Sequence, residues 1–319
     1  MDRLELIKRN VQEIVTENEL EELLKKKDNP VAYVGYEPSG KIHLGHVLTV
    51  NKLLDLQHAG FNIIVLLADV HAYLNQKGTL EQVRKIADYN RDCFIALGLD
   101  PEKTKFVYGS DFQLTSDYML NVLKLTTTAS LNRARRSMDE VGRKMDDPKV
   151  SQMVYPMMQA IDIAFLGVDV AVGGIDQRKI HMLAREGLPS LGFKSPICIH
   201  TPILLGLDGK KMSSSSDNFI SVDDSEEEID QKVKKAFCPA SQIIENPILE
   251  IFRYHIFPRY EEIIFERPEK YGGNLICRGY EELTNVFSEG KLHPMDLKKG
   301  AVKYMNMILE PVRKVLKSN

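Results

Sequence analysis

The chain has 319 residues, of which 43% are hydrophobic and 27% charged, an ordinary composition for a globular enzyme with one large and one smaller domain. Its net charge of −3 is nearly balanced, so a nucleic-acid partner would have to be bound by a local basic face. Cys93, Cys198, Cys238 and Cys277 lack the spacing of a zinc site or disulfide framework, and no signal peptide or membrane-spanning run is evident, so we expect a cytoplasmic protein with no membrane partner.

Hydrophobic periodicity divides the first two thirds of the chain into alternating helices and strands. Apolar residues at helical spacing predict a helix over residues 4–27, and Asn29-Pro30 ends it. Short apolar runs predict strands at 31–36, 62–68, 105–109, 168–172 and 196–200. Helices are predicted at 44–58, at 79–97, over most of 115–165 and at 177–187, with Gly60 and Gly98 ending the first two.

Strands that are apolar throughout and alternate with helices favour an α/β fold with a doubly wound, Rossmann-like parallel sheet. Ligands of such sheets bind at the carboxyl ends of the strands, near the point where the strand order reverses. We therefore expect the chemistry directly after five positions, Tyr36, Asp69, Gly109, Gly173 and His200.

The pattern becomes mainly helical after about residue 225. Ser225 is a candidate N-cap, and Glu228 stands three residues later, as in a capping box. An irregular stretch over 258–295 precedes a final helix predicted at 296–316. We predict two domains, a catalytic domain over 1–224 and a smaller, mainly helical domain over 225–319.

A first candidate site lies between the first predicted strand of the sheet and the helix that follows it. The sequence there runs from Pro38 to His46 and places two histidines, His43 and His46, three residues apart. A helix start presents unpaired N–H groups and a positive dipole end, and both histidines can donate hydrogen bonds to phosphate oxygens. Taken alone, the same segment is more typical of a capped turn with two surface histidines.

A second candidate site is the segment Lys210–Ser216, after the fifth predicted strand. A lysine followed by hydroxyls and backbone amides can surround a polyphosphate. The segment lacks the glycine pattern of a Walker loop. Taken alone, it is also typical of a flexible serine-rich loop.

Together the two segments resemble the paired motifs of class I aminoacyl-tRNA synthetases. The sequence His43-Leu44-Gly45-His46 is similar to the first motif, and the segment 211–215 is similar to the second. A serine of this segment stands where many members have a second lysine, a variant that resembles the archaeal and eukaryotic tyrosyl enzymes. The resemblance implies catalytic roles for His43, His46 and Lys211. It also implies ATP binding by Gly35, Gly45, His46, Lys211, Met212, Ser213, Ser214 and Ser215.

Three further segments resemble the tyrosyl branch of this family: 37–40, 155–159 with Asp162, and 173–179. The spacing of Tyr155, Gln159 and Asp162 places them on one helix face. By resemblance, Asp162 and Tyr33 bind the substrate phenol. The resemblance further implies that the α-amino group and its surroundings are bound by Tyr155, Gln159, Gln177 and Glu37.

The resemblance implies a two-step reaction in which tyrosine and ATP form tyrosyl-adenylate and the amino acid then passes to the terminal ribose of its tRNA. Mg²⁺ is expected on the pyrophosphate of ATP, without a dedicated protein metal site. A basic helix with Arg133, Arg135 and Arg136 is expected to contact the acceptor stem. The anticodon is expected at Tyr271, His293 and Asp296, and the enzymes of this type form homodimers.

Three alternatives stay open from the sequence. A tryptophanyl-tRNA synthetase shares the fold and both motifs, although an indole has less use for the pair Tyr33 and Asp162. A catalytically silent RNA-binding relative is a second alternative, against which stand His43, His46 and Lys211. An adenylate-forming enzyme with a non-tRNA acceptor is the third, and it would leave the second domain unexplained.

Overall fold

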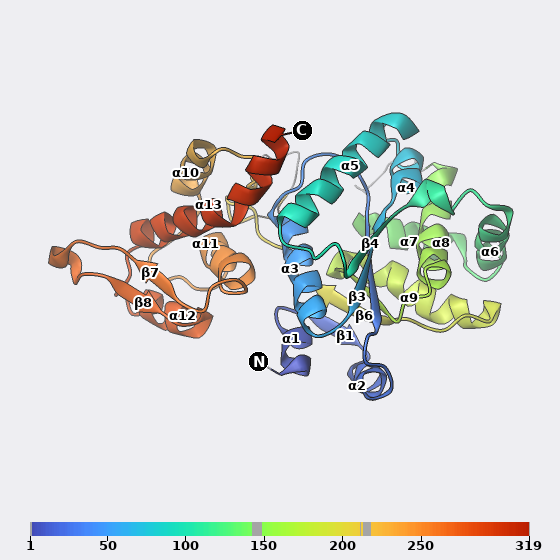
Figure 1. Cartoon of the computed structure of the whole chain (residues 1–319), viewed down its shortest axis with the longest axis horizontal. Helices are drawn as coiled ribbons and strands as arrows, with labels where there is room; N and C mark the ends of the chain where they lie inside the picture. The colour runs from blue at the N-terminus through green and yellow to red at the C-terminus, as the bar shows by residue number, and fades with distance from the viewer. Residues whose placement is uncertain (1, 142–148, 211, 213–217, 319) are drawn as a thin grey trace. The chain divides into compact units, whose positions relative to one another are not determined.

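The computed structural model describes residues 2–141, 149–210, 212 and 218–318. Packing divides them into two compact units (Figure 1). Unit 1 comprises residues 1–40 and 52–202, and unit 2 comprises residues 41–51 and 203–319. These packing units do not test the predicted domain boundary at residue 225. That boundary stays a prediction.

Unit 1 is built on a six-stranded sheet with the order β1-β6-β5-β2-β3-β4. The strands β2 to β6 are mutually parallel, and β1 lies antiparallel to β6 at one edge. Their bounds are β1 Glu13–Val15, β2 Val31–Tyr36, β3 Asn62–Leu67, β4 Thr104–Tyr108, β5 Val170–Gly174 and β6 Ile197–Thr201. The doubly wound α/β fold predicted from the sequence is thereby confirmed.

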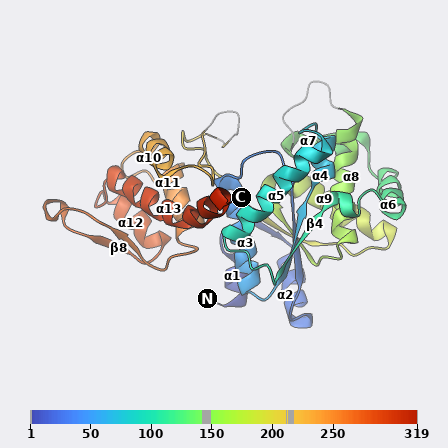
Figure 2. The ribbon, with the colours of Figure 1, turned by 45° about the horizontal axis from the view of Figure 1, so that its top comes forward.

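Helices cover both faces of this sheet. Figures 1 and 2 show α5 and the C-terminal half of α3 on one face, and α8 and α9 on the other. The helices of the sheet region are α1 Arg3–Lys8, α2 Glu17–Lys26, α3 Leu44–His58, α4 Asp69–Leu74, α5 Leu80–Ala96, α6 Ser116–Thr126, α7 Leu131–Val141, α8 Val150–Phe165 and α9 Arg178–Gly187. Short 3₁₀ turns lie at Gly109–Asp111, Ile175–Gln177 and Leu188–Leu191. Gly60 and Gly98 follow their helices with φ of 86° and 111°, which favours glycine there.

The prediction of one helix over residues 4–27 was wrong. Two capped helices, α1 and α2, flank the strand β1. The backbone of β1 pairs with β6, and Glu13 lies opposite His200 in the register. Pairing with a distant strand outweighs the local helical pattern, a tertiary effect that periodicity does not contain.

Unit 2 is mainly helical with one small two-stranded sheet. Its elements after residue 203 are α10 Glu226–Lys235, α11 Pro247–Ile251, a π-helical turn Phe252–Ile256, β7 Ile263–Phe265, a 3₁₀ turn Glu269–Tyr271, β8 Leu275–Cys277, α12 Tyr280–Ser288 and α13 Pro294–Ser318. Figure 2 shows α10, α11 and α12 grouped around the long α13. The predicted capping box is confirmed, because the Ser225 side chain accepts from the Glu228 N–H and the Glu228 carboxylate accepts from the Ser225 N–H.

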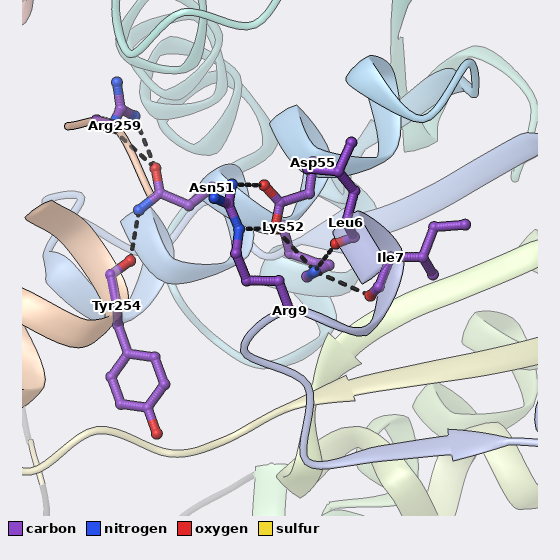
Figure 3. Close-up of polar contacts among 8 residues, drawn as sticks. All are labelled: Leu6, Ile7, Arg9, Asn51, Lys52, Asp55, Tyr254 and Arg259. Carbon is purple, nitrogen blue, oxygen red and sulfur yellow. Dashed lines mark hydrogen bonds and ion pairs between the residues drawn. The ribbon is translucent and has the colours of Figure 1, made fainter. Parts of the chain in front are cut away.

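A buried cluster in unit 1 fixes the C-terminal end of α1 (Figure 3). Lys52 of α3 is 1% exposed, and its Nζ donates to the carbonyl oxygens of Leu6 and Ile7 at 3.1 and 3.0 Å. Its ammonium also lies 2.9 Å from Oδ2 of Asp55, which Arg9 binds in turn. The lysine thus satisfies two carbonyls that the end of a helix leaves without intrahelical partners.

We expect Lys52→Met to lower the free energy of unfolding by about 3 kcal/mol. The change leaves the buried carbonyls of Leu6 and Ile7 and the carboxylate of Asp55 without the ammonium that they bind. Urea unfolding measures the loss. The matched control is Lys26→Met, which removes an exposed pair with Glu22 and should cost less than about 0.5 kcal/mol. Equal losses in the two variants would contradict a structural role for the buried lysine.

Candidate functional site

The strand order of unit 1 reverses at β2, which lies between β5 and β3. The carboxyl ends of these strands are where a doubly wound sheet binds its ligands. Tyr33 stands on β2, and three predicted site residues, Tyr155, Gln159 and Asp162, lie on α8 and are buried. The structure therefore brings the predicted residues of the phenol site together within one unit.

Asp162 is fully buried and is held by two donors. Its Oδ1 accepts from Nε2 of Gln113 at 2.7 Å and from Oη of Tyr118 at 2.8 Å. Burial raises the pKa of Asp162 to about 7, against the opposing effect of these two hydrogen bonds. The side chain is thus a positioned acceptor whose charge is costly to keep inside the fold.

Four buried polar atoms around Asp162 have no hydrogen-bond partner among the described residues: Oη of Tyr33, Nε2 of His71, Oε1 of Gln113 and Oδ2 of Asp162. Nε2 of His71 lies 3.6 Å from Oδ2 of Asp162, and burial lowers the pKa of His71 to about 3, so the imidazole is neutral. Burial and the charge of Asp162 raise the pKa of Tyr33, so its phenol keeps its proton. Unpaired buried groups cost free energy, and their concentration at one place marks a site for a polar ligand group.

This burial predicts a gain in stability for Asp162→Asn at pH 8. The folded-state pKa is raised above that of the unfolded chain, so the wild-type protein loses stability as pH rises from about 4 to about 7. The shift corresponds to about 4 kcal/mol, of which we expect Asn to recover about half because a neutral amide accepts more weakly from Gln113 and Tyr118. Thermal unfolding of both proteins should show the gain at pH 8 and none near pH 4. A variant less stable than wild type at pH 8 would refute it.

A second group of polar side chains lies beside the group around Asp162. Nε2 of Gln159 donates to Oε1 of Gln177 at 3.1 Å, and Gln177 follows β5 in the turn before α9. Glu37 follows β2, and its carboxylate accepts from Nδ2 of Asn75 at 3.0 and 3.1 Å. Burial raises the pKa of Glu37, and burial together with the charge of Glu37 raises the pKa of Tyr155. Acceptor oxygens thus dominate this group, which suits an ammonium ligand.

His43 and His46 stand at the start of α3, in unit 2. Nδ1 of His43 accepts from the Gly45 N–H at 3.1 Å, and Nδ1 of His46 accepts from the His43 N–H at 3.2 Å. This pattern is similar to a capping box with imidazoles in place of the usual hydroxyl and carboxylate, except that the His43 ring accepts from the second residue of the helix, Gly45, and not from the third. Burial lowers the pKa of His43 to about 4 and that of His46 to about 3, so both rings are neutral. With Nδ1 accepting, each ring carries its proton on Nε2 and is a donor there.

The backbone at His43 and Leu44 is bound by residues that follow the segment 211–215 in the sequence. The His43 backbone pairs with Ser221 in an antiparallel bridge, and the Leu44 N–H donates to the Ile220 carbonyl at 3.1 Å. Leu44 and Met212 line the same small pocket within unit 2. Lys211, Ser213, Ser214 and Ser215 lie outside the described residues, so their predicted roles stay predictions.

Two glycines predicted to bind ATP lie where a side chain would disturb the neighbouring groups. A Cβ at Gly35 would lie 2.7 Å from Oη of Tyr33. A Cβ at Gly45 would lie 2.9 Å from Cε1 of His43 and 3.7 Å from Sδ of Met212. At either position a larger residue would force the neighbouring ring to shift, while the predicted contact of these glycines with ATP stays a prediction.

The residues predicted to contact RNA lie on both units. In unit 1, Arg133 of α7 forms an ion pair of 2.5 Å with Glu186, whereas Arg135 and Arg136 are exposed. In unit 2, Tyr271 is 61% exposed. His293 precedes α13 and accepts from the Met295 N–H, and Asp296 lies in the first turn of that helix. Arg133 thus has an alternative structural partner, and the RNA-binding role of all six residues stays a prediction.

The part of the chain that the structure describes contains no group of three or more His, Cys, Asp or Glu side chains placed to hold a metal ion. Within the same residues, no helix is both long enough and apolar enough to cross a membrane.

Sequence reasoning missed three residues that surround Asp162: His71, Gln113 and Tyr118. His71 lies on α4 after β3, and Gln113 follows the turn after β4, so both come after strand ends where chemistry was expected. The available signal located the strand ends but not the side chains that turn inward. Tyr118 lies on α6, away from any strand end, and had no such signal.

The chain matches known proteins in both sequence and structure. Residues 25–310 match the family model of class I tRNA synthetases for tryptophan and tyrosine (W and Y). The tyrosine–tRNA ligase of Methanosarcina mazei is 77% identical over 99% of this chain and all of that protein, and the one of Methanococcoides burtonii is 75% identical with the same coverage. The crystal structure of tyrosyl-tRNA synthetase from Archaeoglobus fulgidus, complexed with L-tyrosine, is 62% identical, covers 98% of both chains and has a TM-score of 0.96.

Proposed function

The chain belongs to the tyrosyl-tRNA synthetase family of class I synthetases, and from this membership we propose which residues activate tyrosine and transfer it to tRNA. Its activity is that of an aminoacyl-tRNA ligase, with ATP as a substrate. The residue roles that follow are our assignments. The geometry of each unit supports those of the described residues, and the roles of Lys211 and residues 213–215 rest on the sequence motif.

One observation supports tyrosine, and not tryptophan, as the amino-acid substrate. Oη of Tyr33 and Oδ2 of Asp162 are buried without a partner among the described residues. The hydroxyl of a bound tyrosine can donate to Asp162 and accept from Tyr33, so a phenol satisfies both. The indole of tryptophan only donates, and it would leave the Tyr33 hydroxyl unpaired.

The α-amino group of tyrosine is assigned to the second group of polar side chains. An ammonium group offers three N–H donors. Oxygen acceptors on Tyr155, Gln159 and Gln177 can receive them, and Glu37 adds a carboxylate nearby. This assignment leaves the carboxylate of tyrosine to react.

In the first step a carboxylate oxygen of tyrosine attacks the α-phosphorus of ATP, the P–O bond to the β-phosphate breaks, and pyrophosphate leaves. Mg²⁺ on the phosphates would neutralise part of the charge of this leaving group. The carboxylate is already ionised at neutral pH, so no general base is needed. We assign the Nε2–H groups of His43 and His46 to the phosphate oxygens, where negative charge develops. Lys211 is assigned to the pyrophosphate, and Gly35, Gly45, Met212 and residues 213–215 to ATP.

In the second step a terminal ribose hydroxyl of the tRNA attacks the acyl carbon, and AMP leaves. We assign Arg133, Arg135 and Arg136 to acceptor-stem phosphates. Tyr271 is exposed and can stack on an unpaired base, and Asp296 can accept from a base edge beside His293. Because charged tRNA is consumed at the ribosome, the proposed place of action is the cytoplasm.

We assign the dimer interface to an exposed apolar face in unit 1. Leu114, Leu120, Leu123 and Leu131 are 63%, 50%, 58% and 70% exposed, on α6 and its flanks. A second copy of the chain would remove these four leucine side chains from water, which favours association. Sedimentation equilibrium at micromolar concentration tests it, and a single mass equal to one chain would contradict the homodimer.

Amino-acid-dependent pyrophosphate exchange tests the proposed function. We expect exchange with tyrosine and not with tryptophan, followed by acylation of purified tRNA. Exchange with tryptophan alone would favour the rival synthetase, and no exchange at all would favour a catalytically silent RNA-binding protein. Exchange without tRNA acylation would point to an adenylate-forming enzyme with another acceptor.

A further inference from the structure

A buried pair of histidines in unit 1 has no part in the reaction described above. His181 of α9 is 1% exposed and His200 of β6 is fully buried. Nδ1 of His181 lies 3.0 Å from Nε2 of His200, and Nδ1 of His200 lies 2.9 Å from Oε2 of Glu13. The carboxylate of Glu13 also accepts from Nε of Arg178 at 2.7 and 3.0 Å. The four residues form one hydrogen-bonded chain from a surface ion pair into the fold.

The donor and acceptor of each hydrogen bond among these four residues follow from the carboxylate of Glu13. The bond from Arg178 lowers the pKa of Glu13, so its carboxylate is ionised and can only accept. His200 must therefore donate from Nδ1. Burial lowers the pKa of both histidines, to about 3 for His181, so each ring is neutral and carries a single proton. Nε2 of His200 is then an acceptor, and His181 must donate from Nδ1.

The inner end of the chain contacts the proposed amino-group site. A Cβ at Gly173 would lie 3.0 Å from Cβ and Cγ of Gln177 and 3.2 Å from Cε1 of His181. The ring of His181 and the stem of Gln177 therefore both lie against the bare backbone of Gly173, at the end of β5. The amide of Gln177 is fixed beyond this stem, with Oε1 accepting from Gln159 and Nε2 donating to Asp176 at 3.3 Å.

We propose that Glu13, His200 and His181 form a positioning chain that holds Gln177 in place for the α-amino group of tyrosine. The chain fixes the tautomer and the orientation of the His181 ring, because a flipped ring cannot donate to His200. The ring in turn supports the stem of Gln177 against Gly173. None of the three residues touches the substrate, so they act through Gln177 alone. The inference rests on the proposed role of Gln177.

The test compares two ligands that differ only at the amino group, tyrosine and 3-(4-hydroxyphenyl)propionate, by equilibrium competition. We expect His200→Leu to reduce the preference for tyrosine over the analogue about 10-fold, which corresponds to about 1.4 kcal/mol. His200→Gln keeps a donor for Glu13 and an acceptor for His181, so it should stay within about 2-fold of wild type. If His200→Leu weakens both ligands equally, the histidine has only a structural role and the proposal fails.

Two further measurements separate the possible failures. Gln177→Ala should reduce the same preference, and an unchanged preference in this variant would refute the proposed role of Gln177 itself. If Gln177→Ala lowers the preference and His200→Leu does not, only the positioning chain is refuted. Glu13→Ala replaces His200→Leu if the latter does not fold, because Glu13 is partly exposed. Imidazole ¹⁵N spectra should show protonated Nδ1 on both histidines at neutral pH. A proton on Nε2 of either histidine would refute the proposed positioning chain.

Discussion

Replacing Asp162 by alanine should reduce the preference for tyrosine over phenylalanine by about 100-fold or more in kcat/KM for pyrophosphate exchange. The substrate hydroxyl loses its acceptor, and phenylalanine no longer leaves Oδ2 of the buried Asp162 carboxylate without a partner. A buried charged acceptor left unpaired costs about 3 kcal/mol, which corresponds to this factor. Tyr33 stays in place and keeps one partner for the hydroxyl, so some preference for tyrosine should survive.

The matched control for this experiment is Asp169→Ala. Asp169 accepts from the Val31 N–H at 2.8 Å and pairs with Lys27 at the amino ends of β2 and β5, the opposite edge of the sheet. Its loss should lower stability without changing the preference between the two amino acids. If Asp162→Ala retains the wild-type preference while folded, the assignment of Asp162 to the phenol is wrong.

The sequence predicted the parallel sheet well because its strands are short apolar runs bounded by turn residues. The strand β2 was predicted with its observed bounds, and α3 likewise. The strand β1 was missed because three residues, Glu13 to Val15, are too few to show a period of two, and their pairing partner lies in β6. Local patterns cannot report a partner that folding alone brings near.

The same limit applies to the site. Asp162, Gln159 and Tyr155 were predicted together because their spacing fixes them on one helix face. Gln113 could not be predicted, because its contact with Asp162 joins the segment after β4 to α8 and depends on side-chain direction. The chain from Glu13 to His200 joins residues 187 positions apart and leaves no trace in periodicity. The sequence also located the two histidines at a helix start, but not that their rings cap it.

The capping geometry of His43 and His46 makes a second large effect predictable. We expect His46→Ala to slow adenylate formation by about 100-fold or more in single-turnover assays, because it removes a donor from the charge that develops on phosphate. Tyrosine affinity should change by less than about 3-fold, since the phenol and amino-group residues belong to unit 1. A variant with weakened tyrosine binding and an unchanged adenylation rate would contradict the assignment.

His46→Gln distinguishes the capping function from the donor function of the ring. Glutamine is the usual residue at this position of a capping box, and its Oε1 can accept from the His43 N–H as Nδ1 of His46 does. Its Nε2 then donates outward in place of the imidazole N–H, so we expect a loss of less than about 10-fold. A loss as large as that of the alanine variant would mean that the imidazole acts by something other than hydrogen-bond donation.

The pH dependence tests whether these donors are neutral. Burial lowers the pKa of His43 to about 4 and that of His46 to about 3, so in the free enzyme both rings lose their charge well below neutrality. kcat/KM for ATP reports ionisations of the free enzyme, and it should therefore show no decline from these rings between about pH 6.5 and 8.5. An imidazolium donor predicts a different profile, in which kcat/KM for ATP falls as pH rises through the ordinary histidine range. A falling limb that His46→Ala abolishes would establish that charged form and overturn the neutral-donor assignment.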